Sequence, residues 1–393
     1  MTKKILFISN GHGEDLNGAA ILAALRQLQP DLEFCALPIV GEGKAYQKLA
    51  IPLIAPTLSL PSGGFVYMGY DQLWRDVRSG LVGLIGAQIK ALQNCGADFI
   101  FATGDVVVIL AALLTGRPFG VFLVSASAFY EGKMILPWLA QWGLNSGRCK
   151  LVFTRDRFSA EDLQRRGLTK AEFRGYPIMD VLEMGTEQLD LEPDRAMIAL
   201  LPGSRMPECG ENLTLQLRII EILHQEVGYP CQACAALVPP LQENLAAVIA
   251  PIGWSIPAPG TMVKGEIKVR YFSSAFAEIL HKCDIVLGMA GTAVEQAVGL
   301  GKPVIQIPGR GPQFNYRFAE AQNRLLGLSV RTIGNQPATI ETLRQAARAI
   351  PQILTDRDYL QACQDNGKVR VGEPGGTLAI AQRLLEAIQT QGN

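Results

Sequence analysis

The sequence has little charge and no excess of either sign. Only 18% of its 393 residues are charged, and 36 Lys and Arg balance 36 Asp and Glu, so the formal net charge is zero. A protein without a basic field has little to hold nucleic acid, and we expect no such partner. A hydrophobic fraction of 48% excludes disorder. The chain is longer than the roughly 250–300 residues at which one hydrophobic core stops growing, so two domains are expected.

Cysteine and long apolar runs are also scarce. Eight cysteines are too few for a disulfide scaffold, and we expect free thiols in apolar surroundings. The uncharged run 49–70 is long enough to span a bilayer, but three prolines and a glycine pair would break the required helix. No segment is therefore expected to cross a membrane. The first strand-like run begins at Lys3 and leaves no room for a secretory signal, which predicts cytoplasmic residence.

Apolar runs rich in β-branched residues alternate with segments of helical period, the pattern of parallel βαβ units. Strands are expected at 4–9, 99–103, 120–125, 151–155, 197–201, 231–238, 268–272, 284–289 and 304–307. In the first half, helices are expected from residue 15 and at 106–114, 134–144 and 158–166. The tail 340–391 also has a helical pattern, broken at 367–376.

This order predicts an α/β fold with two Rossmann-like parallel-sheet domains facing each other across a cleft. The polar stretch Gly185 to Arg195 would join them. We expect an amino-terminal domain over 1–185, a second domain over 196–365, and a last helix in 366–393 that packs across both. Open parallel sheets bind ligands beyond the carboxyl ends of their strands, so the site is expected there.

Three motifs follow predicted strands, and the first is SNGHGEDLNGAA, from residue 9 to 20. Gly11 and Gly13 allow a tight turn, and the following helix would present free amides to an anion or a sugar. The spacing is not the GxGxxG of nicotinamide enzymes. His12 is one of three histidines and would lie in the loop facing the cleft. The alternative is a plain turn in which Glu14 and Asp15 cap the helix.

The second motif is LLPGSR, residues 200–205. The Pro-Gly pair turns the chain, Ser204 offers a hydroxyl, and Arg205 can hold a phosphate in a bidentate fork that lysine cannot make. An ordinary ion pair between Arg205 and Glu208 is the alternative.

The third motif is GMAGTAVE, residues 288–295. Small residues at the strand end let a diphosphate approach the backbone of a helix that begins at Thr292. Glu295 could accept hydrogen bonds from both hydroxyls of a ribose. Thr292 with Glu295 three residues later is also the pattern of a capping box, which needs no ligand.

Together, LLPGSR, GTAVEQAVGLGKPVIQIP and the amino-terminal GHGEDLNGA resemble the lipid-A-disaccharide synthase group of glycosyltransferases, and most closely the subgroup called lipid-A-disaccharide synthase-related. The resemblance covers most of the chain. It implies the two-domain GT-B fold, a UDP-sugar donor held by the second domain and an acceptor held by the first. It also implies inversion at the anomeric carbon, with no metal and no cofactor.

The resemblance also implies roles for residues of the second domain. Ser204 and Arg205 would approach the donor diphosphate, Glu295 would bind the ribose, and Gln313 would lie in the donor-side glutamine region. The implied donor-site residues are Gly203, Ser204, Arg205, Gly291, Thr292, Ala293, Glu295 and Gln313.

A group in the first domain must take the proton of the acceptor hydroxyl. Asp105 follows the predicted strand 99–103 and lies close to the catalytic aspartate proposed for the family, and Gly104 would leave space beside it for a sugar. His12 and Glu14 are rival bases, and Asp105 could instead be a helix N-cap. The acceptor-side loop would hold Gly11, Gly13, Glu14 and Asp15. Both TGDVVV and GHGED depart from the family pattern, so the acceptor stays open.

Other features carry less chemistry. Cys231 and Cys234 have no second pair at ligand spacing, so zinc is not expected. Asp356 and Asp358 open a helix, where acids favour the helix dipole. The aromatic stretches 64–74 and 134–142 would pack in the core, or else rest on a membrane surface or admit an acyl chain.

The predicted function is an inverting glycosyltransferase that moves a sugar, of N-acetylglucosamine type, from a UDP-sugar to a lipid-linked or amphiphilic acceptor. Peripheral contact with the inner face of a membrane is left open, as is the oligomeric state. Two alternatives remain: an enzyme resembling UDP-sugar 2-epimerases, and an inactive nucleotide-sugar-binding regulatory protein.

Overall fold

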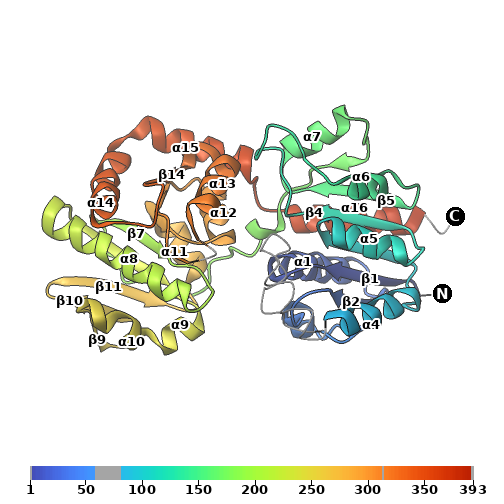
Figure 1. Ribbon diagram of the computed structural model, residues 1–393, viewed down its shortest axis with the longest axis horizontal. Coiled ribbons are helices and arrows are strands. Elements are labelled where there is room, and N and C mark those ends of the chain that lie inside the picture. The colour runs from blue at the N-terminus through green and yellow to red at the C-terminus, as the bar shows by residue number, and fades with distance from the viewer. Residues whose placement is uncertain (1, 58–80, 312–313, 391–393) are drawn as a thin grey trace. The chain divides into compact units, whose positions relative to one another are not determined.

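The computed structural model describes residues 2–57, 81–311 and 314–390, and it divides the chain into two compact units (Figure 1). The first comprises Met1–Asp180 and Glu373–Asn393, and the second Val181–Gly372. The polar stretch expected to join the domains belongs to the second unit. There the backbone N–H of Glu187 donates to Glu278 Oε1 at 3.4 Å, and Ser274 Oγ donates to Glu187 Oε1 at 3.1 Å.

The first unit is built on a six-stranded parallel sheet in the order β2-β1-β3-β4-β5-β6. The strands β3 and β4 are buried at every position, as strands covered by helices on both faces must be. The strands are β1 Lys4–Ser9, β2 Glu33–Pro38, β3 Phe99–Gly104, β4 Phe119–Leu123, β5 Cys149–Thr154 and β6 Ala171–Glu172. The helices are α1 His12–Leu28, α2 Lys44–Lys48, α4 Leu81–Gln93, α5 Val106–Leu114, α6 Trp138–Asn145, α7 Arg157–Arg165, the 3-10 turn η1 Pro177–Met179 and α16 Gly376–Thr390.

A row of phenylalanines crosses one face of this sheet. The ring centroids of Phe7 and Phe101 are 5.4 Å apart, and those of Phe101 and Phe153 are 6.2 Å apart, although β4 lies between their strands. Gly120 lies on β4 beside this row, and a Cβ there would lie 3.5 Å from Phe101 and 3.3 Å from Leu151. All three rings are fully buried, so this face gains both apolar burial and tilted aromatic contacts.

The last helix, α16, returns to the first unit and packs beside α1 (Figure 1). Its beginning is held by Asp180, whose carboxylate accepts from the backbone N–H groups of Gly375 and Thr377, the second at 2.6 Å. Because the first turn of a helix has unsatisfied N–H groups, this carboxylate caps it from a distant part of the sequence.

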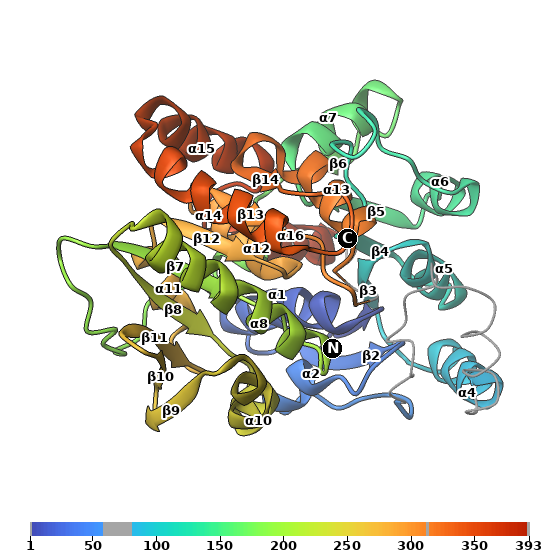
Figure 2. The same ribbon diagram turned by 60° about the vertical axis from the view of Figure 1, so that its left-hand side comes forward.

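The second unit has an eight-stranded mixed sheet in the order β14-β13-β12-β7-β8-β11-β10-β9. Its strands are β7 Ala196–Leu201, β8 Cys231–Ala236, β9 Ser255–Ala258, β10 Thr261–Lys264, β11 Ile267–Phe272, β12 Ile285–Gly288, β13 Val304–Gln306 and β14 Val330–Thr332. The first six in the sheet order are parallel, and β9 and β10 add antiparallel pairs at one edge, next to α10 (Figure 2).

The helices of this unit cover both faces of its sheet. They are α8 Glu208–Ile222, η2 Leu223–Val227, α9 Pro239–Glu243, α10 Leu245–Ile249, η3 Ala250–Ile252, α11 Phe276–Lys282, α12 Thr292–Gly299, α13 Tyr316–Leu326, η4 Gly327–Ser329, α14 Ile340–Thr355 and α15 Arg357–Arg370. The predicted two-domain α/β architecture is confirmed, with the correction that the second sheet is mixed.

Candidate functional site

The candidate site of the first unit lies at the carboxyl ends of β1, β3 and β4, which are neighbours in the sheet. Gly104 at the end of β3 has φ +148°, and a Cβ there would lie 3.3 Å from both Asn10 and Val108. The loop after β1 and the loop after β3 therefore touch. A residue larger than glycine would crowd Asn10 and Val108 here, and the expectation that Gly104 leaves space for a sugar stays a prediction.

Asp105 is the N-cap of α5. Its Oδ1 accepts from the backbone N–H of Val107 at 2.9 Å. The capping interpretation is therefore confirmed. A carboxylate has two oxygens with about four acceptor sites, so this one hydrogen bond leaves capacity for a hydroxyl of a substrate.

The plain-turn alternative requires Glu14 and Asp15 to cap α1, and they do not. The N-cap is Gly11, α1 begins at His12, and no side chain caps it. Glu14 Oε1 instead accepts from Ser125 Oγ at 2.9 Å, and this bond joins the first turn of α1 to the loop after β4. The side chain of His12 lies outside the described residues, and its role stays a prediction, as does that of Gly13.

Asp15 lies inside the unit, with a side chain that is only 2% exposed. Its Oδ1 accepts from Ser9 Oγ at 2.6 Å, and Ser9 Oγ accepts from the hydroxyl of Tyr46 at 3.1 Å. Burial raises the pKa of Asp15 to about 6. The hydrogen bond from Ser9 opposes this rise, and the charge of Glu14 adds to it. Asp15 is therefore a buried structural residue that fixes the end of β1, and its carboxylate is not exposed at the candidate site.

The raised pKa of Asp15 predicts a specific pH dependence of stability. The native state holds the proton up to about pH 6, whereas the ordinary pKa is 3.8, so stability falls as pH rises through this window. The loss is about 3 kcal/mol by linkage. Asp15→Asn should remove this fall and raise the free energy of unfolding at pH 7, measured by urea denaturation across pH 4 to 7. Asn keeps an acceptor for Ser9.

The control for this prediction is Asp31→Asn at an exposed turn, which should retain the fall in stability. A fall that persists in Asp15→Asn would contradict the assignment to Asp15.

The candidate site of the second unit lies where β7 and β12 end side by side. Leu201 pairs with Gly288, and the N–H of Met289 donates to the carbonyl of Leu201 at 2.8 Å. Gly203 has φ +99°, and a Cβ there would lie 3.0 Å from the carbonyl of Met289. The LLPGSR loop and the GMAGT loop, far apart in sequence, are thus in direct contact.

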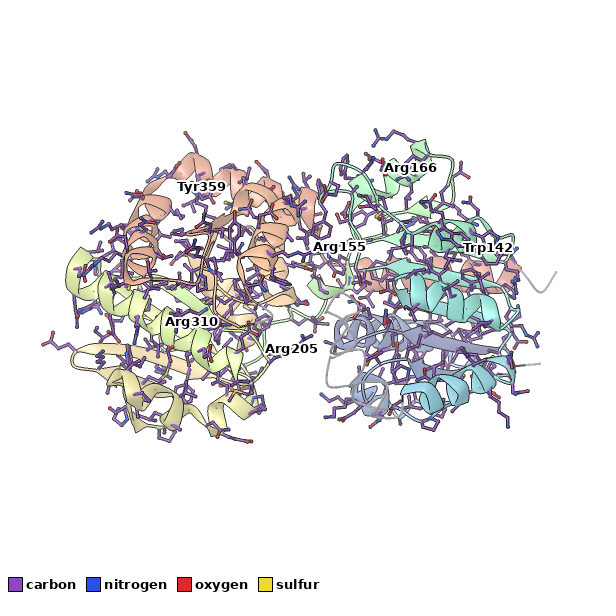
Figure 3. The ribbon with its side chains drawn as sticks, in the orientation of Figure 1. Trp142, Arg155, Arg166, Arg205, Arg310 and Tyr359 are labelled. Carbon is purple, nitrogen blue, oxygen red and sulfur yellow. The ribbon has the colours of Figure 1, made fainter. Side chains whose placement is uncertain are left out.

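Ser204 and Arg205 are exposed on this edge, just before α8 begins (Figure 3). Two buried side chains of α8 hold the loops behind them. Asn212 Nδ2 donates to the carbonyl of Pro202 at 3.0 Å. Glu208 accepts from the N–H of Phe314 at 2.5 Å, which ties α8 to the loop before α13. The proposed pairing of Glu208 with Arg205 stays a prediction.

The helix α12 begins at Thr292 with Gly291 as its N-cap, and no side chain caps it. The capping-box alternative for Thr292 and Glu295 is therefore wrong. Glu295 lies one turn into the helix and is half-buried. The loop is fixed by Gln322 of α13, whose Nε2 donates to the carbonyls of Ala290 and Gly291, both at 3.1 Å.

Three positioning residues had no sequence signal: Asn212, Gln322 and Ser125. Glu208 was named only as a partner of Arg205, and its bond to the N–H of Phe314 was not foreseen. Arg310, an exposed cation in the loop after β13 (Figure 3), was also missed. These side chains come to the carboxyl edges of the two sheets through the order of the strands, which local sequence patterns do not encode. Ala293 follows Thr292 in the first turn of α12, and Gln313 lies outside the described residues.

Asp356 caps α15 by accepting from the N–H of Tyr359 at 2.9 Å, as expected. All eight cysteines are free thiols, and all but the partly exposed Cys231 are buried, which confirms that expectation. Within the described residues, no group of three or more His, Cys, Asp or Glu side chains could hold a metal ion.

The tryptophans of the segment 134–142 do not pack in the core, contrary to the first interpretation, although Met134 and Ala140 do. Trp138 is 73% exposed and Trp142 is 60% exposed, and only Met134 is buried among the large residues that open this segment. The stretch 64–74 lies outside the described residues. Among the helices of the described part of the chain, none is both long and apolar enough to cross a membrane.

The two α/β units are those of the GT-B fold, which solved structures of similar chains share. The chain is similar to the calicheamicin glycosyltransferase CalG4, with 16% identity, coverage of 99% and 98% of the two chains, and a TM-score of 0.62. It is also similar to the UDP-GlcNAc 2-epimerase of Neisseria meningitidis bound to UDP-GlcNAc, with 14% identity, coverage of 99% and 100%, and a TM-score of 0.53.

Two curated proteins are similar in sequence over most of this chain. The chain is 23% identical to the lipid-A-disaccharide synthase of Syntrophotalea carbinolica, over 98% of this chain and 95% of that protein. It is 23% identical to the lipid-A-disaccharide synthase of Azotobacter vinelandii, over 90% and 86%. No family model matches. The chain therefore has the GT-B fold and is related in sequence, over most of its length, to the lipid-A-disaccharide synthases.

Proposed function

We propose that the protein is an inverting glycosyltransferase that moves a sugar of N-acetylglucosamine type from a UDP-sugar to a lipid-linked or amphiphilic acceptor. The observation that carries this proposal is the contact between the LLPGSR and GMAGT loops. Gly203 meets the carbonyl of Met289, and the exposed Ser204 and Arg205 stand on the same edge as the N-terminus of α12. A cation beside free helix amides suits a diphosphate.

The donor would lie along this edge of the second unit. Arg205 would pair with the diphosphate, the amides of Gly291, Thr292 and Ala293 would face it, and Glu295 would accept from the ribose hydroxyls. The similarity to a UDP-GlcNAc-bound epimerase supports a nucleotide of this kind. The acceptor would be held by the first unit, and the relation to lipid-A-disaccharide synthases supports a lipid-linked one. Such an acceptor implies work at the inner face of a membrane.

The transfer needs one chemical step. The acceptor oxygen attacks the anomeric carbon, the bond from that carbon to the phosphate oxygen breaks, and UDP leaves with the electron pair. Asp105 takes the acceptor proton, with His12 and Glu14 as rival bases. Arg205 and the helix amides stabilise the charge that develops on UDP.

Glu295→Ala should weaken UDP binding by about 1–3 kcal/mol, because two ribose hydrogen bonds to a carboxylate are lost. The measurement is titration calorimetry with UDP. The matched control is Glu320→Ala on α13, which removes a carboxylate paired with Arg324 at 2.9 Å on the helix surface. Unchanged UDP affinity in folded Glu295→Ala would leave the glutamate without a role in the donor site.

Turnover should not require a divalent ion, since Arg205 and helix amides neutralise the leaving group in this mechanism. EDTA should leave the rate unchanged within experimental error. Loss of activity with EDTA, restored by magnesium or manganese, would contradict the metal-independent step.

A UDP-sugar 2-epimerase is the second candidate, favoured by the structural similarity to such enzymes. Inversion at C2 breaks a C–H bond, so an epimerase would incorporate deuterium from heavy water into UDP-N-acetylglucosamine without any acceptor. The transferase proposal predicts no deuterium in the donor and release of UDP that depends on added lipid.

A further inference from the structure

The helix α6 exposes an apolar face that we call the α6 patch: Ile135 just before the helix, Trp138 and Trp142. Their exposed fractions are 61%, 73% and 60%. Trp138 and Trp142 are four residues apart and so lie on one face of the helix. Large aromatic side chains this exposed mark a contact surface more often than an isolated exposed leucine does.

Rotation of the helix cannot bury the tryptophans, because its inner face is already closely packed. That face consists of Ala140, Gly143 and Leu144, all buried. A Cβ on Gly143 would lie 2.5 Å from Ile109 and 3.0 Å from Leu113 of α5. Small residues let α6 lie tight against α5, and they fix the tryptophans outward.

The patch is uncharged, and cations border its carboxyl end. The run from Met134 to Gly147 contains no charged residue. At the carboxyl end of α6, Lys170 Nζ donates to the carbonyl of Cys149 at 2.7 Å, and Lys150 Nζ donates to that of Gly147 at 2.7 Å. Arg148 also lies here, donating to the end of α5.

The amino-terminal side of the patch carries charges of both signs. Lys133 is exposed just before it, and Arg166 Nη1 donates to the carbonyl of Met134 at 2.5 Å. The acids nearby are Glu131 and Asp162. Asp162 is buried and is paired with Arg166 at 3.1 Å. Lys133 and Arg166 thus balance Glu131 and Asp162 at this end, and the excess of cations lies at the carboxyl end of α6.

We propose that the α6 patch docks on the surface of a bilayer that contains anionic lipid. Tryptophan favours the boundary between headgroups and acyl chains, and lysine and arginine beside it attract anionic headgroups. A stable protein–protein interface buries about 800 Å² on each partner, more than three side chains on an eight-residue helix supply. Insertion of a few aromatic side chains into headgroups needs no such area.

This inference extends the proposed function, in which the acceptor is lipid-linked, and rests on it only for its biological purpose. The docking is measured without donor or acceptor. Failure to bind vesicles would therefore leave transfer to a detergent-dispersed acceptor intact, and failure of transfer would leave docking intact.

The test is flotation of the full chain with two kinds of vesicle, phosphatidylcholine alone and an equal mixture with phosphatidylglycerol. The wild type should float with the mixed vesicles and should be released by salt. Trp138→Ala/Trp142→Ala should weaken binding about tenfold or more, since both inserted rings are lost. Lys133→Gln/Lys150→Gln should reduce binding to the mixed vesicles alone.

The control is Ile340→Ala/Val369→Ala, which removes exposed apolar side chains from the second unit and should float like wild type. Circular dichroism verifies that each variant is folded. Undiminished binding by the folded tryptophan variant would overturn the proposal. So would a wild-type dimer that this variant dissociates, because the patch would then be an interface between copies.

Discussion

Asp105→Asn should lower turnover by about 10²–10⁴-fold, the usual scale for loss of a general base, and should leave UDP affinity unchanged. Asparagine is as good an N-cap as aspartate, so the hydrogen bond from Val107 to this side chain can persist. The substitution therefore removes the base and keeps the cap. Steady-state rates with a lipid extract as acceptor, together with calorimetry for UDP, measure the two effects separately.

A matched control separates capping from catalysis. Asp356 caps α15 in the second unit through the same kind of bond, at the same 2.9 Å, and Asp356→Asn should turn over like wild type. Near-wild-type turnover of Asp105→Asn, together with a loss in His12→Ala, would move the base to the amino-terminal loop. If neither substitution lowers the rate, the transferase mechanism fails in the first unit.

Arg205→Ala should weaken UDP binding by about 10–100-fold, because a charge-assisted hydrogen bond to phosphate contributes about 1.5–3 kcal/mol. Turnover should fall further, since charge develops on the leaving UDP. Arg205→Lys should restore part of the affinity, because lysine supplies the charge without the planar fork. Calorimetry with UDP and single-turnover rates measure the two losses.

The control for this arginine is Arg218→Ala, an exposed position further along the same helix, α8. It changes the net charge equally and should not alter UDP affinity. A loss in Arg218→Ala as large as that in Arg205→Ala would show that only the overall charge matters and would remove the LLPGSR loop from the donor site.

The fold was predictable where strands are apolar on both faces. The run 4–9 and the segment 106–114 coincide with β1 and α5, because buried parallel strands and all-apolar helices leave little ambiguity. The hairpin β9–β10 was missed, since Ser255–Ala258 is largely exposed and contains a proline. Its position depends on pairing with β11, a tertiary contact that no local pattern encodes.

The sequence motifs of the candidate site could be predicted, but the contacts between those motifs could not. Strand order places the loops after β7 and β12 together, and nothing in the sequence specifies that order. Asp15 was expected to cap α1, but α1 begins at His12, and Asp15 is buried beside Ser9. The tryptophans of α6 have helical spacing, which does not tell which face is buried. Gly143 was the sequence signal for close packing against α5, and it lies on the face of α6 opposite the tryptophans.

The central claim is that the protein transfers a sugar from a UDP-sugar to a lipid. The most direct measurement uses UDP-N-acetylglucosamine labelled in the sugar, incubated with the protein and with or without a bacterial lipid extract. The account predicts that UDP and a labelled lipid form in equal amounts, and only when the extract is present. Absence of labelled lipid, with the donor either unchanged or epimerised at C2, would contradict it.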